Sequence, residues 1–310
     1  MANADADNFH PLEAYRITSL PQAAYYIPAF LTPAESDVLL ADIARQPWTT
    51  LTHRRLQPHP APLTPSGHLL TTKQLPPFLA GVAQRLLELS FADGDGNDGD
   101  KNINSNDNIN VDAAVMGVSL PLTGGSKPQR RQGIFSSSPH GRPNHVLINE
   151  YPPGTGIAPH EDGGAYFPVV CTVSLGAHIV LDVTPKRNYT STETDTATTT
   201  ATNGGSEQAS NGGKEKDKDE GAYKIFQEPL SLLITMGEMY TNHLHGIAAT
   251  TTDGGLSQTT VANWPLLHED TRKHIEAAGG VLQRENVRVS LTCRDVLKVK
   301  DAGRLFGSRR

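Results

Sequence analysis

The sequence predicts a mainly β fold, a sandwich or barrel, with helices beside it. From His145 onward the chain holds short runs rich in Val, Ile and Leu, and Gly and Pro separate these runs at short intervals. This spacing favours antiparallel β architecture over alternating strands and helices. The expected strands cover residues 146–151, 169–175, 177–183, 231–234 and 287–294.

Two helices are expected before this β-rich region, after a short strand at 25–31. The first begins at Pro33, because Thr32 is a good N-cap and Glu35 stands three residues later, which completes a capping box. The second covers 78–89, where apolar residues recur on one helical face. The helices should therefore pack one face against the sheet.

The chain is expected to form one domain over residues 25–296, preceded by a loose leader at 1–24 and followed by a tail at 297–310. Three polar, low-complexity stretches should interrupt the domain as insertions. They lie at about 93–141, 184–222 and 250–285.

Composition agrees with a chain that packs only in part. Hydrophobic residues make up 37% and aromatic residues 6% of the 310 residues. The net charge of −6 lacks the basic excess typical of proteins that grip nucleic acid through phosphates. Cys171 and Cys293 lie in apolar stretches and are interpreted as reduced core thiols. With no secretory signal and no apolar run long enough for a bilayer, we expect an intracellular monomer, in the nucleus or the cytoplasm.

A metal-binding motif follows the turn at residues 152–156. His160 and Asp162 are two residues apart, so on a strand their side chains share one face. Two imidazoles and one carboxylate on one face of an octahedron form the facial triad of iron(II) oxygenases. A His-x-Asp tripeptide alone is weak evidence. The third ligand must come from downstream, where His243 and His245 are both available and only one is needed.

The last expected strand carries two arginines on one face. Arg288 and Arg294 alternate in step with Ser290 and Thr292. Arginine binds a carboxylate through two parallel hydrogen bonds, as a dicarboxylate co-substrate requires. The two arginine α-carbons would lie about 20 Å apart on a straight strand, so contact with one small molecule requires bending or converging side chains. The alternative is an amphipathic strand with arginines facing solvent.

In these motifs, the chain resembles the AlkB-like iron(II)- and 2-oxoglutarate-dependent dioxygenases, and most closely the sixth AlkB homologue subgroup. The resemblance covers about residues 25–90, 142–183 and 228–296. It is densest in Pro143–Tyr151, Pro159–Gly163, Val173–Gly176, Leu244–Ala248 and Arg288–Arg294. It implies a double-stranded β-helix core of the jelly-roll or cupin type, with Fe(II) as cofactor, 2-oxoglutarate as co-substrate and O2 as oxidant.

The resemblance also assigns roles to residues. It implies His160, Asp162 and His245 as iron ligands, and no catalytic side chain beyond the metal centre. The co-substrate set is Asn149, Tyr151, Arg288, Arg294 and, on the same strand face, Ser290.

The substrate is less defined. Residues 51–57 would form a lid on the substrate side. Arg54, Arg55 and Lys73 are candidate substrate-side residues, and whether they form a positive rim beside the metal separates a nucleic-acid substrate from a protein or small molecule. Relatives that repair bases carry an acidic residue two positions after the aspartate ligand, where this chain has Gly164. Three hypotheses follow: demethylation of alkylated nucleic acid, the same chemistry on a protein or small molecule, and a non-catalytic scaffold.

Overall fold

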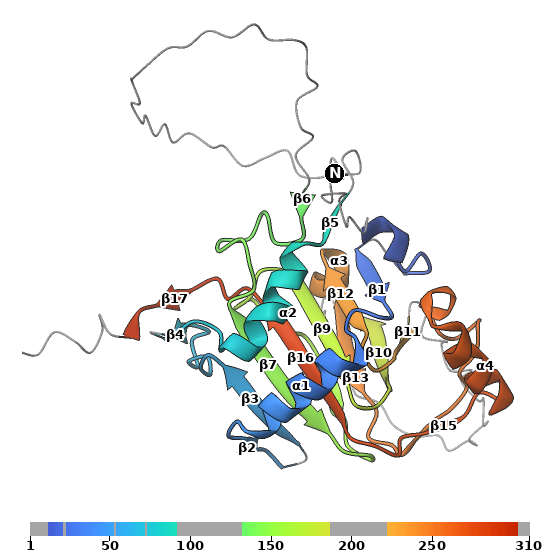
Figure 1. The fold of residues 1–310 in the computed structure, drawn as a ribbon. Coiled ribbons are helices and arrows are strands. Elements are labelled where there is room, and N and C mark those ends of the chain that lie inside the picture. The colour runs from blue at the N-terminus through green and yellow to red at the C-terminus, as the bar shows by residue number, and fades with distance from the viewer. Residues whose placement is uncertain are drawn as a thin grey trace, which may run out of the picture.

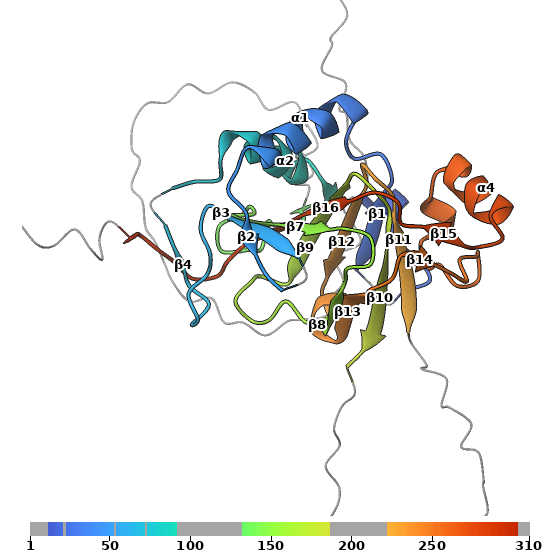
Figure 2. The same ribbon diagram turned by 90° about the horizontal axis from the view of Figure 1, so that it is seen from below.

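Two antiparallel sheets face each other at the centre of the fold (Figures 1 and 2). The computed structural model describes residues 12–20, 23–52, 54–71, 73–91, 132–186 and 222–302. The larger sheet has the order β1 (Ala24–Ile27), β12 (Leu232–Met236), β9 (Val169–Leu175), β16 (Arg288–Arg294), β7 (His145–Tyr151), β3 (Arg55–His59) and β2 (Thr49–Thr50). The smaller sheet has the order β11 (Tyr223–Gln227), β10 (Ile179–Pro185), β13 (His243–Ile247) and β8 (Ile157–His160). The predicted mainly β class with a jelly-roll-type core is confirmed.

Short elements complete the described part of the chain. Three two-stranded pairs join β14 (Thr252–Asp253) to β15 (Leu282–Gln283), β17 (Val299–Lys300) to β4 (Leu69–Leu70), and β5 (Ser90–Phe91) to β6 (Gln132–Gly133). The helices are α1 (Pro33–Ala44), α2 (Pro77–Leu87), α3 (Glu238–Thr241) and α4 (Glu269–Ala277), with 3-10 turns at Leu12–Tyr15 and Trp264–Leu266. None of the helices in the described ranges is long and apolar enough to cross a membrane.

Helices α1 and α2 cover the outer face of the larger sheet, and the smaller sheet lies on its other side (Figure 2). The capping box expected at the start of α1 is confirmed. The Thr32 N–H donates to Glu35 Oε2 at 2.7 Å, and the Glu35 N–H donates to Thr32 Oγ1 at 3.3 Å. Arg85 of α2 then pairs with Glu35 at 2.7 Å, which joins the two helices.

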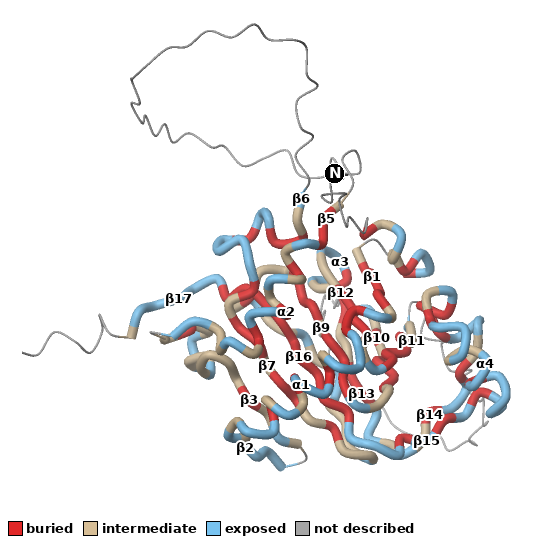
Figure 3. Tube along the Cα trace, in the orientation of Figure 1, coloured by how far each residue is buried: buried red, intermediate tan, exposed pale blue. Residues whose placement is uncertain are grey.

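Strand alternation separates the apolar core from the inner cavity, and Figure 3 shows the buried central strands. On β16, Val289, Leu291 and Cys293 pack toward the helices. Their neighbours Arg288, Ser290, Thr292 and Arg294 line a cavity between the sheets. A one-residue slip in register would therefore exchange apolar and polar faces, so the pattern fixes the register.

The expected insertion at 250–285 is wrong, because this segment is folded and packed. Trp264, Leu267 and Ile275 are buried in an apolar cluster that they share with residues of β10 and β11 in the smaller sheet. Asn263 acts as a strand-like partner: its Oδ1 accepts from the Phe226 N–H at 2.9 Å and its Nδ2 donates to the Phe226 oxygen at 2.7 Å. A few large apolar residues, widely spaced among polar ones, therefore attach this segment to the core.

Three other boundaries also need correction. Leu12, Ile17 and Leu20 of the expected leader are buried. Residues 132–141 of the first expected insertion contribute β6 and a buried Phe135. Part of the expected tail forms β17. The remaining stretches of these expectations, 1–11, 92–131, 187–221 and 303–310, lie outside the described residues.

Candidate metal and co-substrate site

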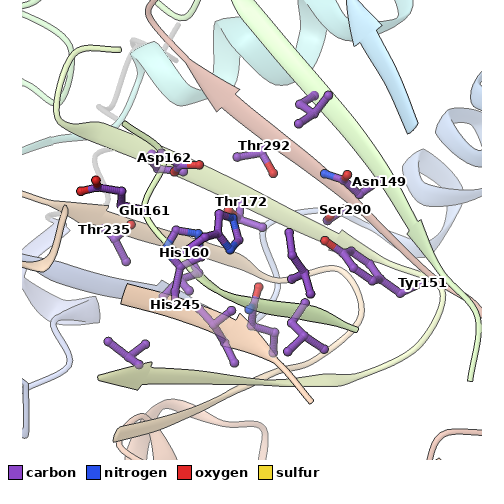
Figure 4. Close-up of a pocket in the computed structure, with 18 of the residues that line it drawn as sticks. Asn149, Tyr151, His160, Glu161, Asp162, Thr172, Thr235, His245, Ser290 and Thr292 are labelled. Atoms are coloured by element: carbon purple, nitrogen blue, oxygen red, sulfur yellow. The ribbon is translucent and has the colours of Figure 1, made fainter. Parts of the chain in front are cut away.

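A cavity of about 300 Å³ opens between the two sheets, and Figure 4 shows the side chains that line it. Strands β7 and β16 of the larger sheet supply one wall, and β8 and β13 of the smaller sheet supply the opposite wall. Polar groups gather here because each strand turns every second side chain inward. The predicted metal and co-substrate residues all line this one cavity. They are Asn149, Tyr151, His160, Asp162, His245, Arg288, Ser290 and Arg294.

His160, Asp162 and His245 form a compact group of possible metal ligands. One ligand atom from each lies within 4.8 Å of the others. His160 and His245 stand opposite each other in the antiparallel pairing of β8 and β13, and their ring centroids are 4.4 Å apart. Pairing between the strands therefore brings together ligands that are far apart in the sequence (Figure 4).

Local contacts fix how these ligands are presented. His160 Nδ1 lies 2.9 Å from the Ala158 carbonyl oxygen, which only accepts, so Nδ1 carries the proton and Nε2 keeps a lone pair for a metal. Burial lowers the pKa of His245, which favours the neutral imidazole that ligation requires. Gly246 permits close packing of the two strands, because a Cβ there would lie 2.9 Å from Pro159 N.

The structure separates the two candidate histidines of β13. His243 is buried, and its Nδ1 lies 3.1 Å from the Glu238 carbonyl oxygen. It is not part of the ligand group, whereas His245 is. His243 therefore contacts the start of α3, while His245 belongs to the ligand group.

The two arginines of β16 serve opposite ends of the cavity rather than converging on one group. Arg294 Nη2 pairs with Asp162 Oδ1 at 3.1 Å, and the Arg294 guanidinium lies 4.5 Å from the Tyr166 ring centroid. Arg288 lies near Tyr151, with 5.6 Å between the guanidinium and the ring centroid. Arg294 thus orients a metal ligand, and Arg288 is left for another anion.

Arg288 is a buried cation without a carboxylate partner among the described residues. Its Nη2 donates to Ser174 Oγ at 2.9 Å and to Gln227 Oε1 at 3.1 Å, both neutral groups. Burial lowers its pKa to about 10, so the side chain is still charged at neutral pH. A buried charge in this state is costly unless an anion binds beside it.

Unsatisfied polar groups at this wall also indicate a ligand site: Arg288 Nε is a buried donor without a hydrogen-bond partner among the described residues. Asn149 Oδ1 is buried and has no hydrogen-bond partner within the described chain. Asn149 pairs with Ser290 across β7 and β16, just as Tyr151 pairs with Arg288. Burial raises the pKa of Tyr151, so its hydroxyl remains a donor at neutral pH. With Arg288, these residues offer a ligand several hydrogen-bonding groups on one wall, and Figure 4 shows Asn149, Tyr151 and Ser290 among them.

The three candidate substrate-side residues occupy different surroundings. Arg54 lines the cavity, and its buried Nε has no partner in the described part of the chain. Arg55 instead makes two hydrogen bonds to Glu150, at 2.7 and 2.6 Å, and stacks on Trp48. Lys73 is exposed and does not line the cavity. Of the three basic residues, only Arg54 therefore lines the cavity.

Gly164 and His53 are the two other positions that the sequence placed on the substrate side. No atom lies within 4 Å of where a Gly164 Cβ would stand, so this position leaves open space. His53 of the expected lid lies outside the described residues.

Sequence reasoning missed several lining residues. Gln227, Thr172 and Thr235 line the cavity, and Gln227 of β11 and Ser174 of β9 hold Arg288. They are polar residues within largely apolar strands, and that was the available signal. Such a position indicates an inward polar group without indicating what it contacts.

Comparisons with known proteins found a relative that is similar over nearly the whole chain. No family model matches the chain. A relative from Danio rerio, named Probable RNA/DNA demethylase ALKBH6, is 28% identical over 303 residues, which is 96% of each chain. The AlkB-like resemblance expected from the sequence is confirmed by this relative.

Similar solved structures overlap only loosely. OsALKBH1 has 13% identity and a TM-score of 0.40, covering 89% of this chain and 99% of its own. An oxidoreductase of the 2OG-Fe(II) oxygenase family from Burkholderia pseudomallei has 9% identity and a TM-score of 0.42, covering 96% and 95%. TM-scores below 0.5 reflect a partial overlap of folds.

Proposed function

We propose that this chain, which resembles the AlkB-like iron(II)- and 2-oxoglutarate-dependent dioxygenases, removes N-methyl groups from alkylated nucleic acid by oxidation. One observation carries the assignment of the site. A cluster of two histidines and one aspartate shares a cavity with a buried arginine that has no carboxylate partner among the described residues. The donor set suits iron(II), and the arginine suits the distal carboxylate of 2-oxoglutarate.

Each residue of the chain has a separate task in this proposal. His160, Asp162 and His245 hold the metal, which when bound supplies the oxidation of a C–H bond coupled to decarboxylation of 2-oxoglutarate to succinate. Arg294 orients Asp162 through their 3.1 Å contact.

The co-substrate is held at the other end of the cavity. Arg288 binds its distal carboxylate, while Asn149, Tyr151 and Ser290 offer further hydrogen bonds. Apolar side chains of the same cavity, among them Val183, limit the access of water. Hydroxylation of the carbon of an N-methyl group would give an N-hydroxymethyl group, whose C–N bond breaks to release formaldehyde and leave an N–H.

Arg54 is proposed as the anchor for an anionic group of the substrate. It lines the cavity without a carboxylate partner in the described chain, whereas the neighbouring Arg55 is neutralised by Glu150. A phosphate contact to Arg54 fits a nucleic-acid substrate. Gly164 favours the second candidate, a protein or small-molecule substrate, because the acidic base contact of repair enzymes is missing.

The pair Arg54 and Arg55 gives a matched test of the substrate. Formaldehyde release and succinate formation are followed with methylated oligonucleotides and, in parallel, with methylated peptides. We expect Arg54→Ala to raise KM for the oligonucleotide about 10-fold, the loss of one charge-assisted contact, and Arg55→Ala to change it little. Turnover of peptides alone would favour the second candidate, and failure to bind iron and 2-oxoglutarate would favour the scaffold.

The free thiols are consistent with a proposed intracellular location, nuclear or cytoplasmic. Cys171 and Cys293 are opposite each other on β9 and β16 and both are reduced. Reduced thiols are typical of proteins in the cytosol and nucleus.

A further inference from the structure

Gln227 is the residue that completes the binding site of Arg288. It ends β11 and is 1% exposed. Its Oε1 accepts from Arg288 Nη2 at 3.1 Å and from Ser174 Oγ at 3.1 Å, while Ser174 Oγ itself accepts from Arg288 at 2.9 Å. Three side chains from three strands thus form a closed ring of hydrogen bonds.

The ring dictates which end of the Gln227 amide faces the cavity. Arg288 can only donate, so the amide oxygen must point toward it, and a flipped amide would place two donors against each other. The opposite end, Nε2, has no hydrogen-bond partner within the described residues, and Gln227 lines the cavity. The amide therefore offers its donor beside the cation.

The neutrality of Gln227 matters as much as its shape. A glutamate at this position would have the same size and would form an ion pair with Arg288. The amide instead holds the guanidinium in place and leaves its charge free for a ligand. A buried cation held by neutral groups binds an anion strongly, because the cost of desolvating the cation has already been met in folding.

We propose that Gln227 is a specificity-determining residue that makes the cavity select a 2-oxo acid with an ionised distal carboxylate. The amide Nε2 donates to that carboxylate, and Oε1 holds Arg288 for a second contact. This inference rests on the proposed function, since it assumes that Arg288 receives the distal end of 2-oxoglutarate. It adds a donor from the smaller sheet that the sequence did not indicate.

The test compares 2-oxoglutarate with 2-oxoglutaramate, which replaces the distal carboxylate by a neutral amide. Binding to the protein loaded with Mn(II), as a redox-stable substitute for iron, is measured by calorimetry. The wild type should prefer 2-oxoglutarate. Gln227→Glu should weaken 2-oxoglutarate about 100-fold, the value of charge-assisted hydrogen bonding, and should leave 2-oxoglutaramate within about 3-fold, so that the preference falls or reverses. Gln258→Glu, the same change at an exposed position, should alter neither affinity.

Folding is checked by circular dichroism, and Gln227→Met provides a second route if the glutamate variant does not fold. Methionine keeps the charge of Arg288 but removes the donor, so 2-oxoglutarate should weaken about 10-fold and the preference should shrink. An unchanged preference in a folded Gln227 variant would overturn this inference and leave the proposed function standing. A wild type that binds neither ligand would overturn both.

Discussion

The unpaired charge of Arg288 leads to a prediction with opposite signs for stability and for binding. Replacement by methionine removes a cation that the described chain does not neutralise, while keeping much of its volume. The variant should therefore fold at least as well as the wild type and should fail to bind 2-oxoglutarate. If Arg288 served only to stabilise the core, its replacement would lower stability and leave 2-oxoglutarate binding unchanged.

The magnitude follows from the pKa. Burial lowers the pKa of Arg288 to about 10, from an ordinary arginine value of about 12.5. Each pKa unit corresponds to about 1.4 kcal/mol, so the charged form costs the fold up to about 3 kcal/mol. Loss of the hydrogen bonds to Ser174 and Gln227 offsets part of this gain, although these two partners stay bonded to each other at 3.1 Å.

Urea unfolding of the metal-loaded protein, with and without 2-oxoglutarate, measures both effects. At a ligand concentration of about 100 times Kd, the wild type should gain about 2.7 kcal/mol, and Arg288→Met should gain nothing. Arg284 is the matched control, since it is equally buried but makes two hydrogen bonds to Asp253, at 2.7 and 2.6 Å. Arg284→Met leaves the buried Asp253 carboxylate with only His178 Nε2 beside it, at 3.4 Å, and should cost about 3–5 kcal/mol.

The reasoning would be refuted by an Arg288→Met variant that loses several kcal/mol without ligand and still gains stability from 2-oxoglutarate. That result would make Arg288 a structural residue and would place the co-substrate elsewhere.

Three further predictions concern the site and its support. Gly246→Ala should lower iron affinity at least about 10-fold by isothermal titration, because the new Cβ would lie 2.9 Å from Pro159 N and force β13 away from β8; unchanged affinity would contradict the close-packing argument. Burial lowers the pKa of His145 to about 4, so the unfolded chain takes up a proton below about pH 6.5 that the fold rejects, and stability should fall as pH falls. His145→Leu should remove about 1 kcal/mol of this loss between pH 7.5 and 5.5 in urea titrations, and an identical pH profile would count against it. Trp264→Ala should cost about 3–5 kcal/mol in a single cooperative transition, whereas a cost below about 1 kcal/mol would mean that residues 250–285 fold apart from the core.

The sequence was sufficient for features set by local chemistry. The capping box at Thr32 and Glu35 predicted the start of α1, because both partners lie within one turn. The alternation of Arg288 with Leu291 and their neighbours predicted which side of β16 is polar. His160 and Asp162 do fall in one ligand group, as their spacing indicated, although β8 ends at His160 and Asp162 lies beyond the strand.

Features set by contacts across the sheets could not be predicted in this way. Spacing alone left His243 and His245 equivalent, and only the pairing with β8 places one of them opposite His160. The role of Gln227 depends on β11 lying near β16 and on the inward direction of one amide. The segment at 250–285 is polar on average, and this average hides the few apolar residues, such as Trp264, that make its core contacts.

The central claim is that three residues hold iron while Arg288 holds the distal carboxylate of 2-oxoglutarate in the same cavity. The most direct measurement is anaerobic addition of iron(II) and 2-oxoglutarate to the metal-free protein, with the weak visible charge-transfer band of the chelate as readout. The account predicts a band in the wild type, its loss in His160→Ala and Asp162→Ala, and a much higher 2-oxoglutarate requirement in Arg288→Met. Absence of the band from folded wild-type protein at millimolar co-substrate would contradict the account.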